Sequence, residues 1–260
     1  MRITILGSGS IVPSAFRFGS GVHVRAGEVE MLLDCGPGVL EKMRRLSLSP
    51  FNLSAVCITH FHVDHVTDLL PLLKLRAFTP EGLPNLEPKP IRILGPKGTK
   101  RLLKTLIDEN EFFTYLATLM KYESYSQSED VEPWKTYDIG GASLTSAPVT
   151  HGGGIAYRLE YQGASIAFSG DTAFDENMAK LAKGVDVLIH ECSFPSEKLA
   201  GQHVSEIELA RIVELARPKT VVVTHLYPVW ESQEHRIVEA LEGRHRCRVI
   251  IANDCLELSL

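Results

Sequence analysis

The chain contains, at residues 55–65, the stretch Ala-Val-Cys-Ile-Thr-His-Phe-His-Val-Asp-His, in which an apolar run ends in four potential metal ligands. Side chains at alternate positions of an extended chain point the same way, so His60, His62 and Asp64 can share one face, whereas His65 needs a turn to join them. Imidazole and carboxylate groups suit zinc, iron or manganese. Four such groups exceed what one open catalytic ion normally takes, so the spacing favours two ions over a surface loop rich in histidine.

The composition is that of a globular enzyme. A chain of 260 residues can bury one sizeable core, and we expect a single domain over residues 1–260 rather than two small ones. The 27 Lys and Arg against 32 Asp and Glu give a formal net charge of −5, which argues against avid nonspecific binding to nucleic acid. A basic run at Lys97, Lys100, Arg101 and Lys104 is expected to be a solvated helix face, with a local phosphate-binding surface as the alternative.

The cysteines and the first residues of the chain indicate the cellular compartment that we expect for the protein. Five cysteines without CxxC spacing are typical of reduced thiols in a cytosolic protein: Cys35, Cys57, Cys192, Cys247 and Cys255. Residues 1–7 begin directly as a strand, without the apolar region of a signal peptide, and no run approaches the length of a membrane span. We therefore expect a cytoplasmic protein that makes no membrane contact.

Short apolar runs, many of them separated by Gly or Pro, alternate with helical patterns along the chain. The expected strands cover residues 3–6, 22–24, 31–33, 56–59, 91–94, 142–146, 156–160, 165–169, 185–189, 220–224 and 248–251. The expected helices cover residues 69–78, 99–120, 176–182, 205–216 and 232–241. Four prolines make residues 79–90 a loop, and the polar, acidic residues 122–137 are expected to be irregular.

Three Thr-His pairs, ending at His60, His151 and His225, each follow an apolar run. Functional groups gather at the carboxyl ends of strands in open α/β sheets, so these segments can converge on one site. Asp171, after Gly170, could bridge two cations, with the N-cap of a helix over residues 174–183 as the alternative. Asp34 has two open interpretations, the N-cap of a helix and a residue that orients a metal ligand.

These residues resemble the ligand set of the metallo-β-lactamase superfamily. The motif His60-x-His62-x-Asp64-His65 and the later His151, Gly170-Asp171 and His225 stand in the superfamily's order. The resemblance implies an α/β fold, a four-layer αβ/βα sandwich with two sheets face to face and helices outside. It also implies that one ion takes His60, His62 and His151, that a second takes Asp64, His65 and His225, and that Asp171 bridges them. We expect two divalent ions, zinc first and manganese or iron as alternatives.

Other segments are similar to ribonuclease Z and its phosphodiesterase relatives. They are residues 6–10 with Arg17 and Ser20, residues 33–38, and residues 169–172 followed by His190-Glu191. In ribonuclease Z a glutamate in a His-Glu-Ala-Thr segment and a histidine in a Gly-His-Ser-Thr segment relay a proton, and Glu191 and His203 occupy the matching positions. The resemblance therefore implies a general acid pair, against the alternatives of a solvated acid and a helix-capping or surface histidine.

Departures from that family bear on the substrate. Cys192-Ser193 replaces Ala-Thr, Val204-Ser205 replaces Ser-Thr, and Val63 stands where glycine is usual. Only residues 152–169 separate His151 from the loop of Asp171, which leaves no room for the long arm with which many ribonucleases Z grip transfer RNA. A small substrate therefore suits this chain better than RNA.

We expect a dinuclear metal hydrolase that cleaves a phosphodiester or related anionic ester through a metal-bridged hydroxide. Asp64 orients the hydroxide, while His203 and Glu191 assist departure of the leaving group. The alternatives are a lactonase-like or arylsulfatase-like hydrolase and a metal-binding regulatory protein without turnover. The family also suggests a homodimer, with an apolar contact for which core packing of a helix is the stronger interpretation: Phe112, Phe113, Leu116, Leu119 and Met120.

Overall fold

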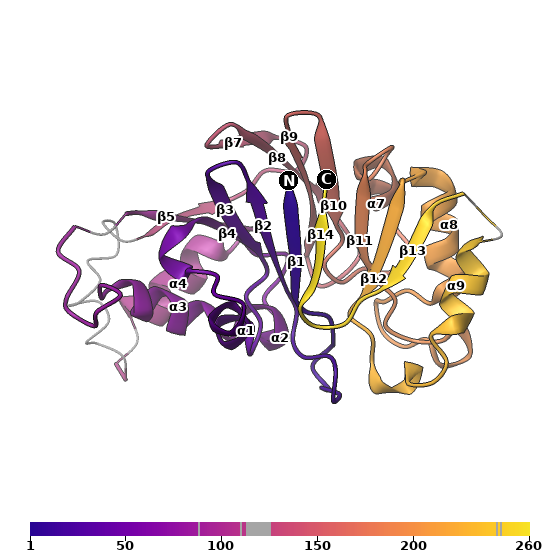
Figure 1. The fold of residues 1–260 in the computed structure, drawn as a ribbon, viewed down its shortest axis with the longest axis horizontal. Coiled ribbons are helices and arrows are strands. Elements are labelled where there is room, and N and C mark those ends of the chain that lie inside the picture. Colours follow the sequence, from indigo (N-terminus) through magenta and orange to yellow (C-terminus); the bar gives the residue numbers. More distant parts are fainter. Residues whose placement is uncertain (88, 110, 113–125, 243, 245) are drawn as a thin grey trace.

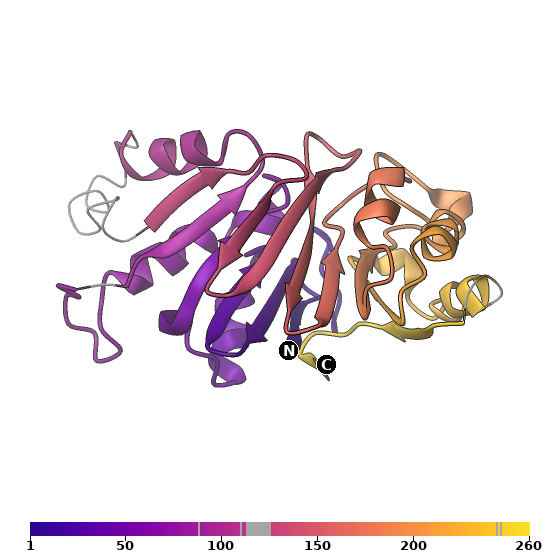
Figure 2. The same cartoon turned by 90° about the horizontal axis from the view of Figure 1, so that it is seen from above.

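The computed structural model describes residues 1–87, 89–109, 111–112, 126–242, 244 and 246–260. Its strands form two seven-stranded sheets that lie face to face (Figures 1 and 2). The first sheet has the order β14 (Leu256–Ser259), β1 (Arg2–Gly7), β2 (Gly21–Ala26), β3 (Val29–Leu33), β4 (Leu53–Cys57), β5 (Ile91–Gly95) and β6 (Ser126–Asp130). The second has the order β13 (Arg248–Ile251), β12 (Thr220–Thr224), β11 (Val187–Glu191), β10 (Ala164–Phe168), β9 (Ile155–Tyr161), β8 (Ala142–Pro148) and β7 (Thr136–Ile139).

The helices cover the outer faces of the two sheets (Figure 1). Those beside the first sheet are α1 (Val39–Arg45), α2 (Val63–Val66), α3 (Leu69–Arg76) and α4 (Thr99–Ile107), with the 3₁₀ turn η1 (Pro50–Asn52). Those beside the second are α7 (Glu176–Leu181), α8 (Glu206–Ala216) and α9 (His235–Glu242), with η2 (Ser196–Lys198) and η3 (Pro228–Trp230). This is the αβ/βα sandwich that the sequence predicts.

Three apolar clusters join the four layers. Because successive side chains of a strand point to opposite faces, a strand buried on both sides contributes to two clusters. In β4 and the residue after it, Cys57 packs between the sheets, whereas Val56 and Ile58 pack toward the first set of helices. In β11, Ile189 packs between the sheets and Leu188 packs toward the second set. The continuous apolar runs of the sequence are therefore the strands with helices on one face and the partner sheet on the other.

Each expected strand is present; residues 220–224 and 248–251 have the expected bounds, and the bounds of the others differ by up to three residues. The expectation that residues 122–137 are irregular is wrong for β6 and for the first half of β7, which lie there, and holds for residues 131–135 between them. Both are edge strands, which need few apolar side chains because one side has no strand neighbour. The short helices α1 and α2 and the edge strand β14 were not expected from the pattern.

The helix expected over residues 99–120 includes α4, which ends at Ile107. All four basic residues of the run between Lys97 and Lys104 are exposed, as expected of a solvated face. Of the apolar residues suggested as a dimer contact, Phe112 is 83% exposed, so core packing is wrong for it. The others, Phe113, Leu116, Leu119 and Met120, lie outside the described residues. None of the described helices combines the length and the apolar character that crossing a bilayer requires.

Candidate metal centre

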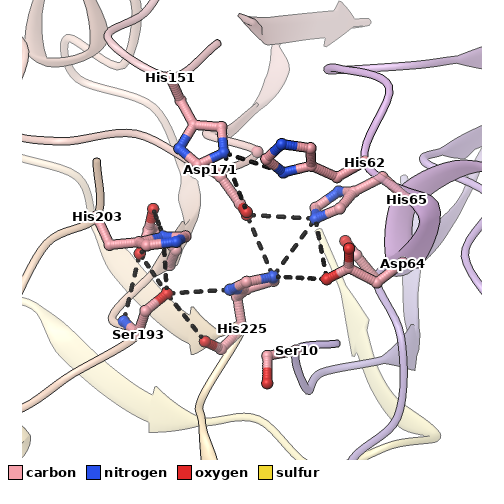
Figure 3. Close-up of polar contacts among 12 residues, drawn as sticks. Ser10, His62, Asp64, His65, His151, Asp171, Ser193, His203 and His225 are labelled. Carbon is pink, nitrogen blue, oxygen red and sulfur yellow. Dashed lines mark hydrogen bonds and ion pairs between the residues drawn. The ribbon is translucent and has the colours of Figure 1, made fainter. Parts of the chain in front are cut away.

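The candidate metal ligands lie in the loops that follow strands of the two sheets and, for Asp64 and His65, in the short helix α2, and their side chains point toward one another (Figure 3). In the first sheet, β3 and β4 run parallel and deliver Asp34 and the segment that begins at His60. In the second, β10, β11 and β12 run parallel and deliver Asp171, Glu191 and His225. The carboxyl ends of parallel strands meet at the same edge, so residues far apart in the sequence converge as the Thr-His pairs predict.

The turn that His65 requires is helix α2, which begins immediately after His62. Both Asp64 and His65 are buried within this helix. Asp64 was expected on extended backbone beside His60 and His62, and this expectation is wrong because the chain turns into α2 before it. The helix nevertheless carries Asp64 to the cluster, on the side of His225, whose Nε2 lies 3.4 Å from Asp64 Oδ2.

One group of potential ligand atoms comes from His60, His62, His151 and Asp171, all within 4.8 Å of one another. A second group comes from Asp64, His65 and His225 within the same limit. Asp171 faces both groups. Its Oδ2 lies 3.7 Å from His60 Nε2 and 3.8 Å from His151 Nε2, whereas its Oδ1 lies 3.3 Å from both His65 Nε2 and His225 Nε2. The N-cap interpretation of Asp171 is wrong, because Asp175 caps α7.

The residues of this cluster fit divalent ions. Among the described residues, His60 Nε2 and Asp171 Oδ1 are buried atoms without a hydrogen-bond partner. An unsatisfied buried polar group costs on the order of 1–3 kcal/mol, and a charged one costs more. Both atoms point into a set of imidazoles and carboxylates, which is the donor chemistry of zinc and related metals. A cation in each ligand group would satisfy these atoms, His60 Nε2 in the first group and Asp171 Oδ1 beside the second.

The backbone around the cluster adopts left-handed conformations. Asp34 has φ 60°, Gly170 has φ 58° and His225 has φ 53°. A Cβ on Gly170 would stand 2.6 Å from Thr59 Cβ, so the turn before Asp171 requires glycine for its dihedral angles and for space. A residue other than glycine in this region costs roughly 1–3 kcal/mol of strain and persists only where the surroundings hold it. Such strain is common at functional sites.

Hydrogen bonds behind the cluster fix the imidazole rings. Asp34 Oδ2 accepts a bond of 2.6 Å from His65 Nδ1, which leaves His65 Nε2 directed at Asp171. The backbone N–H of Thr59 donates to Asp34 Oδ1 at 2.8 Å. His151 Nδ1 donates to the carbonyl of Gln202 at 2.7 Å. Asp34 therefore orients a candidate ligand, and its N-cap alternative is wrong because Gly38 stands at the start of α1.

Glu191 and His203 form a pair beside the cluster. Glu191 is completely buried, and His203 Nδ1 donates to its Oε1 at 3.0 Å. A ring nitrogen of His203 also lies within 4.8 Å of ligand atoms of Asp171 and His225. The alternatives are wrong for both residues, because Glu191 is not solvated, the His203 side chain is only 12% exposed, and Ser205 caps α8.

Ser193 joins this pair to the cluster and was not singled out from the sequence. Its Oγ donates to Glu191 Oε2 at 2.6 Å and lies 3.0 Å from His225 Nδ1 and 3.2 Å from His203 Nδ1 (Figure 3). The available signal was that Ser193 keeps a hydroxyl where the His-Glu-Ala-Thr segment has threonine.

Burial and neighbouring charges set the protonation of these groups. Burial, aided by His65, lowers the pKa of His60 to about 2, which keeps the imidazole neutral as a ligand must be. Burial opposes the ionisation of Asp171, but His225, His65 and His60 outweigh it and hold the pKa well below its usual range. Burial also opposes the charging of His203, yet its hydrogen bond to Glu191 and that residue's charge raise the pKa of the imidazole.

A cavity of about 400 Å³ opens over the cluster. Its lining residues are Ile11, Phe61, His62, Val63, Asp64, Asp171, His203 and Tyr227. Two larger cavities, of about 510 and 550 Å³, are lined by residues outside the cluster. The convergence of buried ligands, and not volume, marks the smaller cavity as the candidate active site.

The sequence of the chain is similar to those of known metal-dependent hydrolases. Residues 30–226 match the β-lactamase superfamily domain. A ribonuclease Z from Mycolicibacterium paratuberculosis is 32% identical over 265 residues, which cover 94% of this chain and 92% of that protein. The segment that matches the superfamily domain, residues 30–226, contains the whole cluster from His60 to His225.

Solved structures share the fold. The metallo-β-lactamase fold protein YhfI from Bacillus subtilis has a TM-score of 0.81 at 20% identity, over 99% of this chain and 98% of that one. A diphosphatase from the PhnP family has a TM-score of 0.75 at 20% identity, over 100% of this chain and 97% of that one. At this level of identity the likeness concerns the arrangement of the chain.

Proposed function

The chain belongs to the β-lactamase superfamily as a ribonuclease Z-like, metal-dependent hydrolase of ester bonds, and from that membership we propose that it cleaves a phosphodiester or related small anionic ester at a centre of two divalent ions. The observation that carries the proposal is the position of Asp171. Its two oxygens face two separate groups of buried imidazoles, at 3.7 and 3.8 Å on one side and 3.3 Å on the other. One carboxylate between two ligand groups is the arrangement expected of a bridging residue.

In this proposal His60, His62 and His151 hold one ion, Asp64, His65 and His225 hold the other, and Asp171 serves both. Zinc is the proposed metal, and manganese and iron accept the same donors. When bound, a pair of divalent ions supplies an activated water near neutral pH and stabilises the attacking and leaving oxygens. The orphaned atoms His60 Nε2 and Asp171 Oδ1 support this assignment.

The residues of the chain supply the proton transfers. Asp64 accepts a hydrogen bond from the attacking water and so orients it. His203 donates a proton to the departing oxygen through Nε2, because its Nδ1 is engaged by Glu191. The pKa of His203 is raised, with burial opposed by Glu191, which favours a protonated imidazole at the start of the reaction. The hydroxyl of Ser193 contacts both Glu191 and His225 and holds the two side chains in place.

RNA is the second candidate substrate, favoured by the identity with ribonuclease Z. Two observations support the smaller ester instead. Only residues 152–169 separate His151 from the loop of Asp171, and residues 155–168 of this segment form the short hairpin of β9 and β10, which leaves no room for a long RNA-gripping arm. The 32 Asp and Glu outnumber the 27 Lys and Arg, and this acidic balance disfavours a polyanion, whose affinity comes mostly from Lys and Arg contacts to phosphates.

A panel of substrates tests the proposal. Zinc-loaded and manganese-loaded protein is incubated with bis-p-nitrophenyl phosphate, a p-nitrophenyl carboxylic ester, an aryl sulfate, a lactone and a precursor tRNA. We expect the phosphodiester to be hydrolysed fastest, with activity lost on chelation and restored by the metal. Faster turnover of the lactone or the sulfate would favour those hydrolase classes, processing of the precursor would favour RNA, and no turnover at all would favour a regulatory metal-binding protein.

A further inference from the structure

The cavity over the metal cluster has an apolar side that the metal chemistry does not use. It is formed by Ile11, Phe61, Val63 and Tyr227. Ile11 is 49% exposed, Phe61 36% and Val63 60%, so large apolar side chains face solvent next to the buried ligands. Exposed apolar surface that borders a polar site is typical of a ligand-binding wall.

Neighbouring residues hold this apolar wall in place. The Phe61 ring lies beside Gly98 at the start of α4, where a Cβ would stand 3.4 Å from Phe61 Cε2. The Tyr227 ring stacks on Phe194 with centroids 4.3 Å apart. The loop that carries Ile11 is tied to the loop that carries Tyr227, because Gly9 forms a bridge with Leu226. Three segments distant in sequence therefore build one wall.

The charged groups of the cavity all belong to the catalytic cluster. The described residues that line it include His62, Asp64, Asp171 and His203 but neither lysine nor arginine. Negative charge on a ligand would therefore be held at the metal ions, and a second anionic group would meet no protein cation there. The part of the ligand away from the ions contacts carbon, for which an uncharged apolar group is the match.

We infer that the substrate carries an aromatic group on the hydrolysed ester and that Phe61, Val63, Ile11 and Tyr227 bind it. An aromatic ring suits a wall that contains the aromatic side chains of Phe61 and Tyr227, since rings pair edge to face or offset as well as burying area. The inference rests on the proposed function, because it takes the metal ions as the holders of the anionic group. The inference adds to the proposed function the chemical class of the ester group that lies away from the ions.

Binding of two phosphonates tests the inference without turnover. Benzylphosphonate and methylphosphonate carry the same anionic group and differ in the aromatic ring. Isothermal titration calorimetry on the zinc-loaded protein should give a dissociation constant about tenfold lower for benzylphosphonate, as expected when a ring is removed from water. Phe61→Ala and Val63→Ser should each reduce that preference to below about threefold. The matched control is Leu86→Ala, because Leu86 is 89% exposed in the loop between α3 and β5, and it should keep the wild-type preference.

Equal affinity for the two phosphonates would overturn the inference, as would a preference that survives in both wall variants. The proposed function is judged separately, with benzyl and methyl p-nitrophenyl phosphate, which share one leaving group. If neither ester is hydrolysed while benzylphosphonate still binds more tightly through Phe61, phosphodiester hydrolysis is wrong and the aromatic site stands. If both are hydrolysed and the phosphonates bind equally, hydrolysis stands and the aromatic site is wrong.

Discussion

At the scale of single residues, the chemistry depends on which atoms are left without partners. Asp171 is 3% exposed, yet its Oδ1 has no hydrogen-bond partner among the described residues. His60 Nε2 is in the same position. Their arrangement is explained if both atoms contact cations.

A variant of His203 tests the proposed proton transfer independently of metal binding. We predict that His203→Ala lowers turnover of bis-p-nitrophenyl phosphate by about 10²–10⁴-fold, the usual contribution of a general acid, while metal content stays unchanged. Steady-state kinetics and elemental analysis of the same preparation check this. The control is His235→Ala, at an exposed histidine that begins α9. If metal and turnover were lost in equal proportion, His203 would be a structural residue.

Ser193 is predicted to position its neighbours. Its hydroxyl contacts Glu191, His203 and His225, so Ser193→Ala should lower kcat about tenfold through the loss of one buried hydrogen bond to a charged group. Ser193→Thr retains the hydroxyl and should recover most of the rate. The two variants are compared by kcat and KM after circular dichroism has established that both are folded. A threonine variant as slow as the alanine variant would argue for a packing effect.

The seven candidate ligands could be predicted from the sequence because a metal site requires particular side chains at strand ends, and those side chains are rare in combination. Ser193 could not, because a serine after a strand is common and its role depends on three partners from other segments. The orientation of Asp34 was undecided for the same reason. It became clear only when the structure placed its carboxylate against His65.

At the scale of elements, the two faces of each strand determine what can be predicted. Strands buried on both sides, such as β11, are continuous apolar runs and were expected from the sequence. The edge strands β6, β7 and β14 were not expected, because their exposed faces carry polar residues that break the apolar pattern. The short helix α2 also escaped prediction, since four residues carry no helical period.

Strand β2 carries a buried histidine that makes stability depend on pH. Burial lowers the pKa of His23 despite its hydrogen bond to Glu30 in β3. The unfolded chain therefore binds a proton more readily than the folded one, and the folded state loses stability as pH falls through about 6.5. We predict that His23→Gln, which cannot titrate, reduces the fall in the free energy of unfolding between about pH 7.5 and 5.5 by up to about 1 kcal/mol.

Urea denaturation at the two pH values measures this difference. His235→Gln is the control, since His235 is exposed and its replacement should keep the wild-type pH dependence. A His23→Gln variant that loses as much stability as the wild type would show that the buried imidazole is not responsible.

At the scale of the whole molecule, the centre joins the two halves of the sandwich. His60, His62, Asp64 and His65 follow the first sheet, whereas His151, Asp171 and His225 follow the second. Ions that bind both sets therefore stabilise the contact between the sheets. The pairing of strands into two sheets could not be worked out from the apolar pattern, because that pattern does not specify neighbours. The architecture was predicted through the resemblance of the ligand motif to a known superfamily.

Metal removal is accordingly predicted to weaken the whole fold. Ligands that bind only the folded state stabilise it by mass action, by about 4 kcal/mol at a thousandfold excess over the dissociation constant. We expect chelation to lower the melting temperature by several degrees and readdition of zinc to restore it. Differential scanning calorimetry of wild type and Asp171→Asn checks this, and the variant should respond less to zinc. A melting temperature that does not change when the metal is removed would argue against ions that bind ligands from both sheets.

The central claim is that Asp171 stands between two metal ions. The most direct measurement is the metal content of the wild-type protein after reconstitution with zinc or manganese and removal of excess ion, determined by plasma mass spectrometry against the protein concentration. We predict about two ions per chain, as in other two-metal hydrolytic sites. A value clearly below two with both metals would contradict it.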